Sequence, residues 1–145
     1  MPRTSEAIQV GQVTIRFLLE GPATAGQVTM FEADIPAGAK VPVAHSHDGY
    51  EETAYGLKGT LTWTVDGRKT EVGPGDVLFI PRGAVHRFDN HSGADATMLA
   101  VVTPGVLKPA FFREMAAVLA ASAGGPPDPK AVGEVMKRHG LTPAP

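Results

Sequence analysis

The chain has 145 residues, of which 43% are hydrophobic and 19% charged, and its formal net charge is −2. This length and composition are typical of one globular domain, and so small a charge gives no electrostatic reason to expect nucleic acid or an anionic membrane as a partner. The sequence has no cysteine, which excludes disulfides, thiolate metal sites and cysteine nucleophiles. Any bound metal must therefore use histidine and carboxylate ligands.

The first residues have no long apolar stretch behind Arg3, so they do not have the pattern of a signal peptide. No apolar run approaches the roughly 20 residues that a helix needs to span a bilayer. We therefore expect a cytoplasmic protein with no membrane partner.

Gly and Pro residues separate short apolar runs along most of the chain, a pattern typical of an all-β barrel or sandwich. Asp66-Gly67 predicts a type I′ hairpin turn, because both central positions of that turn need positive φ. The continuous apolar run within 76–80 predicts a strand buried on both faces. In all we expect about nine strands, at residues 13–19, 27–35, 41–46, 52–57, 61–65, 68–72, 76–80, 85–88 and 96–103.

The composition changes after residue 108. A helical stripe of apolar residues begins at Pro109 and is stopped by Gly124-Gly125. A second short helix is expected from Asp128 to about His139. We expect these helices to brace the barrel or to pack on a partner subunit, with a lid over a binding site as the alternative.

Five histidines are present, and two of them form the pair His45-Ser46-His47. On a strand, side chains two residues apart point to the same face, so both imidazoles can converge on one ion. Glu52 lies an odd number of residues beyond His47, so an unbroken strand would direct it to the opposite face. Gly49 between them can take the turn or bulge that resets the register.

Glu51 competes with Glu52 for the role of carboxylate ligand, since unbroken alternation favours it. The parity of Glu52 carries the small residues Ala54 and Gly56, which leave room for a metal and a ligand. The parity of Glu51 carries bulkier residues at 53, 55 and 57, which would fill that space. The pattern favours Glu52.

His86 supplies a fourth group, after a Pro-x-Gly turn that fixes where its strand restarts. Three imidazoles and one carboxylate suit one divalent first-row transition metal per chain: Fe, Mn, Ni, Co, Cu or Zn. They do not suit Ca or Mg, which prefer shells of oxygen ligands.

These residues fall into two motifs. The first comprises Gly38, His45-Ser46-His47, Glu52 and Gly59, and the second comprises Gly75, Pro81, Gly83, His86 and Asn90. Together they resemble the two motifs of the cupin superfamily, with one departure: the spacer between Gly38 and His45 is six residues instead of about five. The resemblance implies a single-domain cupin β-barrel (a double-stranded β-helix, or jelly roll) at 1–108 with its motif core at 38–90, a helical extension at 109–145, and a homodimer.

Among cupins, the pattern HxHxxxxExxY with a helical extension looks most like the quercetin-dioxygenase-like group. That resemblance implies a metal-dependent dioxygenase or oxidoreductase acting, with O₂, on a small enol, phenol or diketone. It makes His45, His47, Glu52 and His86 the metal ligands, and Glu52 a catalytic base as well.

We expect substrate to meet Tyr50, Ala54, Gly56 and Phe88, with a solvated loop position as the alternative for Tyr50. Two further functions stay open. One is isomerase, lyase or decarboxylase chemistry on a polar metabolite, and the other is non-enzymatic binding of a metal or ligand.

Overall fold

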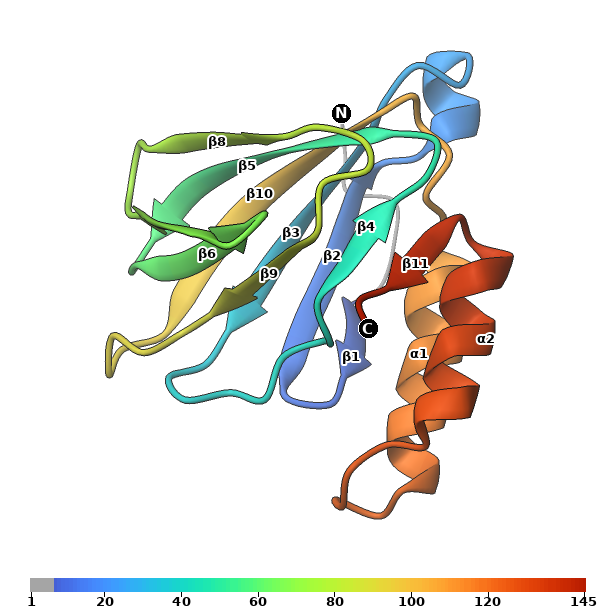
Figure 1. Ribbon diagram of the computed structural model, residues 1–145. Helices are drawn as coiled ribbons and strands as arrows, with labels where there is room; N and C mark the ends of the chain where they lie inside the picture. Colours follow the sequence, from blue (N-terminus) through green and yellow to red (C-terminus); the bar gives the residue numbers. More distant parts are fainter. Residues whose placement is uncertain (1–6) are drawn as a thin grey trace.

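The computed structural model describes residues 7–145, which form two antiparallel sheets facing each other and two helices at one side of them (Figure 1). Residues 1–6, the predicted start of the barrel domain, lie outside the described residues. Among residues 7–145, neither helix combines the length and the apolar character needed to cross a bilayer. The prediction of an all-β jelly roll with a C-terminal helical extension is confirmed.

The larger sheet has six strands, and its inner face supplies most of the core. Along β2, β3 and β10 buried residues alternate with half-buried ones, which is the period of two that a half-buried strand requires. Phe17, Ala33 and Ala100 are completely buried on this inner face. In spatial order the strands are β1 (Ala7–Val10), β2 (Val13–Leu19), β3 (Thr29–Ile35), β10 (Ala96–Thr103), β5 (Glu51–Lys58) and β8 (Val77–Ile80).

The smaller sheet has five strands and carries the two motif histidine segments. Asp66 and Gly67 have φ values of 47° and 81°, and they join the paired strands β6 and β7, as the predicted type I′ hairpin requires. In spatial order the strands are β11 (Leu141–Pro143), β4 (His45–His47), β9 (His86–Asp89), β6 (Leu61–Val65) and β7 (Arg68–Val72).

Two strand predictions need correction. The strand expected at 41–46 begins only at His45, and Pro42, which has no N–H to donate, lies in the irregular segment before it. Strand β8 is not buried on both faces, because it is an edge strand of the larger sheet and Val77 and Phe79 are 66% and 58% exposed. Strands β1 and β11 were not predicted.

The C-terminal helices close one side of the molecule. Helix α1 (Pro109–Ala121) directs Phe112 toward the inner face of the larger sheet, where its ring centroid lies 5.7 Å from Phe17 and 5.2 Å from Phe31. Helix α2 (Pro129–Arg138) is capped by Asp128, whose side chain accepts a hydrogen bond from the Lys130 N–H. Strand β11 then joins the smaller sheet, so the extension is not purely helical. The domain division at residue 108 stays a prediction.

Candidate metal centre

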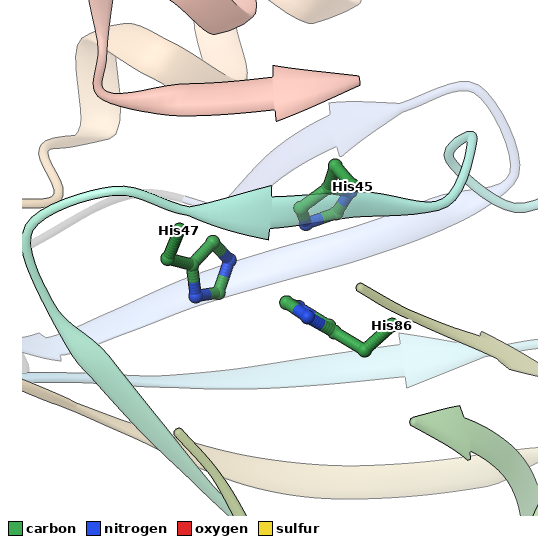
Figure 2. Close-up of side chains that lie close together, drawn as sticks. All are labelled: His45, His47 and His86. Atoms are coloured by element: carbon green, nitrogen blue, oxygen red, sulfur yellow. The ribbon is translucent and has the colours of Figure 1, made fainter. Parts of the chain in front are cut away.

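Strands β4 and β9 bring three histidines together. His45 and His86 are direct partners in the β4–β9 pairing, and His47 follows His45 on the same strand. Figure 2 shows the three rings turned toward one another. Their ligand nitrogens all lie within 4.8 Å of one another. The described residues thus contain a cluster of three imidazoles that suits one metal ion.

The strand that carries His45 and His47 is held mainly by the C-terminal strand. In the register of β4 with β11, His47 lies opposite Leu141 and His45 opposite Pro143. The Asp48 N–H donates to the Gly140 carbonyl at 2.8 Å, next to the β4–β11 pairing. Since β4 shares only one residue pair with β9, strand β11 contributes most of the backbone pairing that positions these two histidines.

Hydrogen bonds to the backbone fix the tautomers of two of the rings. His45 Nδ1 lies 2.8 Å from the Val43 carbonyl oxygen, and His86 Nδ1 lies 2.9 Å from the Ala84 carbonyl oxygen. A carbonyl oxygen only accepts, so each Nδ1 carries the proton and donates it. The Nε2 atom of each ring then has a free lone pair, which is the form that binds a metal.

All three rings are held neutral. Burial, together with the smaller effect of the neighbouring His86, lowers the pKa of His45 to about 4 and of His47 to about 2. Burial also lowers the pKa of His86 itself. In the described part of the chain the buried His47 Nδ1 has no hydrogen-bond partner. Buried, neutral nitrogens with free lone pairs fit a bound first-row metal ion.

Glu52 stands beside this cluster. Its Oε1 lies 3.7 Å from His47 Nε2, and burial raises its pKa to about 7. The chain bends at residues 48–49 and crosses from the smaller sheet to β5 of the larger one, which is how Glu52 comes to face His47. Glu51 points elsewhere, because its carboxylate pairs with Arg82 and its side chain is 26% exposed.

Two aromatic residues pack behind the histidines. The Tyr50 ring stacks on His47 with 4.4 Å between centroids, and Tyr50 is only 1% exposed, so it is not a solvated loop residue. Trp63 stacks on His86 at 6.2 Å and also contacts Phe88 at 5.2 Å. Both residues therefore pack against the imidazole rings of the histidine cluster, a role that the sequence analysis did not predict for either of them.

A cavity of about 550 Å³ opens in front of the cluster and is bordered by His45, His47, Glu52 and Phe88. A smaller cavity of about 40 Å³ adjoins His45 and His86, which is space for a few water molecules.

The other predicted substrate residues lie away from this cavity. Ala54 is completely buried opposite Ala100 and Leu78. Gly56 lies against the turn at residue 73, where an added Cβ would meet the Gly73 carbonyl oxygen. Its lack of a side chain makes room for the backbone of that turn, so the prediction that it makes room for substrate needs correction. Tyr50 stacks on His47 and does not border the cavity.

The comparisons with known proteins agree with this geometry. Residues 31–102 match the family model described as "Cupin domain". Over 94 residues, 63% of this chain, the sequence is 36% identical to a protein of Bacillus subtilis named "Quercetin 2,3-dioxygenase". The match spans only 26% of that relative's length.

Solved structures give the same result. The polyketide cyclase RemF from Streptomyces resistomycificus is 28% identical with a TM-score of 0.59, covering 75% of this chain and 88% of its own. A predicted oxalate decarboxylase from Thermotoga maritima is 26% identical with a TM-score of 0.62, covering 68% of this chain and 90% of its own. Together with the two sheets and the two motifs, these matches make the chain a member of the cupin superfamily.

Proposed function

We propose that the protein is a metal-dependent enzyme of the dioxygenase or oxidoreductase kind, acting on an enol, phenol or diketone. The observation that carries the proposal is the cluster of three neutral histidines, two of them buried, with Glu52 beside it at one end of a mostly apolar cavity. Cavities of this size with a few converging polar groups are the usual form of a small-molecule site. The similarity to a protein named as a quercetin dioxygenase supports the class of reaction.

His45, His47 and His86 would hold one divalent first-row ion (Fe, Mn, Ni, Co, Cu or Zn), with Glu52 as a fourth ligand. When bound, such an ion supplies Lewis-acid chemistry at a substrate oxygen and a place for O₂ beside it. The protein's own contribution is to exclude water from the buried end of the cavity and to orient the substrate against Phe88.

Glu52 also suits the role of a general base. A base works best when its pKa lies near the operating pH, and burial raises the pKa of Glu52 to about 7 when its carboxyl is not bound to an ion. An enol or phenol bound near the three histidines would lie within reach of its carboxylate. In this proposal Glu52 takes the hydroxyl proton, and the substrate is left as an enolate or phenolate.

A polar-metabolite isomerase, lyase or decarboxylase is the second candidate, favoured by the resemblance to the predicted oxalate decarboxylase. It would need cationic groups to hold a carboxylate or phosphate. Of the described residues that border the larger cavity, only Lys40 is basic apart from the histidines of the cluster, and it is exposed. The polarity of the site therefore favours the first candidate.

Oxygen consumption tests the proposal. The metal-loaded protein should consume O₂ when given flavonols or diketones, and Glu52→Gln should reduce the rate by roughly 100-fold or more, the contribution typical of a general base. Glu51→Gln is the matched control, since Glu51 pairs with Arg82 outside the cluster. Substrate loss without O₂ uptake would favour the second candidate, and stable binding with no conversion would favour a non-enzymatic binding protein.

We also propose that the protein forms a homodimer through the outer face of β5 and β8. Four large apolar side chains of these neighbouring strands are 40% to 66% exposed: Tyr55, Leu57, Val77 and Phe79. Contiguous exposed apolar residues of this kind commonly mark subunit contacts. Sedimentation should give a dimer for the unaltered chain and a monomer for Val77→Glu/Phe79→Glu.

A further inference from the structure

The cavity in front of the histidines extends well beyond them. At one end it is bordered by His45, His47 and Glu52. At the other end it reaches Gly124 and Pro127, in the connection between α1 and α2. We propose that the C-terminal helices form a wall of the substrate site, and that the ligand is an elongated, uncharged, mostly apolar molecule with one oxygen-bearing end at the histidines. This inference rests on the proposed function, since it assigns the oxygen-bearing end to the metal cluster.

Side chains of α1 make the helical wall. Met115 and Leu119 lie one turn apart on this helix and both border the cavity, as does Phe112. Phe112 also packs on Phe31 of the larger sheet, so the helix is joined to the barrel at this point. The cavity thus lies between the barrel and the helices, with α1 as an integral part of its lining.

The barrel supplies the opposite wall. Val13 and Ile15 of β2 and Phe31 of β3 point inward and border the same space. Figure 1 shows β1, the neighbour of β2 in the larger sheet, beside α1, in agreement with this arrangement. Both walls are therefore built from aliphatic and aromatic side chains, and they offer few partners for a polar body.

Size and polarity together define the ligand. The volume of about 550 Å³ lies within the range of roughly 300–1,000 Å³ that is typical of sites for drug-sized molecules. Protein interiors are otherwise closely packed, so an apolar space of this size is a place for an apolar guest. A small polar metabolite would leave most of it unfilled, whereas an extended apolar body would bury its surface against both walls.

Binding of a homologous series of metal-chelating probes tests the inference. Acetohydroxamate, hexanohydroxamate and decanohydroxamate share one oxygen-bearing head and differ only in their alkyl chains. Calorimetry with the Co²⁺-loaded protein should show affinity rising about threefold to fourfold per added methylene, the gain expected for burial of a CH₂ group. An affinity that stays flat along the series would overturn the inference and leave the metal-centred function standing.

A pair of variants locates the apolar part of the site. Leu119→Trp places a larger side chain in the cavity and should lower the affinity for decanohydroxamate at least about tenfold, with little effect on acetohydroxamate. Ala117→Trp is the matched control, because Ala117 lies on the exposed side of the same helix. Equal effects of the two variants would contradict the assignment of α1 as a wall. The series on the unaltered protein needs neither variant to fold.

A metal-independent probe separates the two claims. The uncharged dye Nile red should fluoresce with the metal-free protein and should do so less with Leu119→Trp than with Ala117→Trp. If the dye behaves in this way while hydroxamates fail to bind at any metal load, the apolar site stands and the proposed metal chemistry is wrong. If the dye does not bind and the hydroxamate series is flat, the apolar site is wrong.

Discussion

Metal binding to the metal-free protein should release a proton from Glu52. Burial raises the pKa of this carboxyl from 4.5 to about 7, so much of it is protonated at neutral pH. Moving the pKa that far corresponds to about 3 kcal/mol of unfavourable ionisation free energy, which a bound cation would offset. The carboxyl must lose its proton to become a ligand.

The amount released follows from that pKa. One ion should displace about 0.9 proton at pH 6 and about 0.1 at pH 8. His45 and His47 should add almost nothing at pH 6, because their pKa values are lowered to about 4 and about 2. Burial lowers the pKa of His86 as well, so it should release less than an ordinary histidine would.

Calorimetric titration with Co²⁺ in two buffers of different ionisation enthalpy measures this proton release directly. Glu52→Gln should abolish the difference between pH 6 and pH 8, whereas Glu51→Gln should preserve it. Equal release by the unaltered protein and by Glu52→Gln would show that the proton does not come from Glu52. So would a release near zero at pH 6.

Three further perturbations have defined outcomes. Removal of residues 141–145 deletes β11 and should weaken metal affinity at least about tenfold, because β4 loses its main pairing partner. Competition with a chromophoric chelator measures this affinity, and an unchanged value would contradict the role of β11 in positioning His45 and His47. Acidification of the metal-free protein from pH 6.5 to 4.5 should lower its free energy of unfolding. On unfolding, three histidines whose pKa values are lowered in the folded protein take up protons, whereas Glu52, whose pKa is raised, loses only one. Urea unfolding should show a loss on the order of 1–3 kcal/mol per pH unit, and rising stability on acidification would exclude this assignment. Gly56→Val should lower the melting temperature by many degrees, because the introduced valine side chain would collide with the backbone of residue 73. An unchanged melting temperature would show that this turn moves freely.

The histidine cluster could largely be predicted from the sequence, because its geometry depends on local rules. Side chains two apart on a strand share a face, which is enough to pair His45 with His47. The choice of Glu52 over Glu51 depended on which parity carries small residues, and in the structure Tyr55 and Leu57 of the other parity are about 40% exposed. The spacing of the two motifs indicated that His86 belongs to the same site.

Features that depend on contacts between distant segments were not readable. Nothing near residues 141–143 indicates that they pair with β4, because this pairing depends on where two helices deliver the chain end. The same holds for Tyr50, whose burial comes from stacking on His47 across the bend. The apolar run of β8 gave a wrong prediction, because an edge strand and a central strand have the same local pattern.

The cavity is the clearest example. Its lining comes from β2, β3, the segment before β4, and both helices, so no single stretch of sequence contains its signal. The residues chosen from the sequence for substrate contact, Ala54 and Gly56, were chosen for their small size. In the structure that small size serves close packing of strand and turn instead.

Elemental analysis of the protein purified without an affinity tag, beside His47→Ala/His86→Ala, tests the central claim most directly. We expect close to one divalent first-row ion per chain in the unaltered protein and almost none in the variant, with both proteins folded by circular dichroism. If the unaltered protein takes up no metal even after reconstitution, or if the folded variant retains the same amount, the three histidines are not a metal centre and the account is wrong.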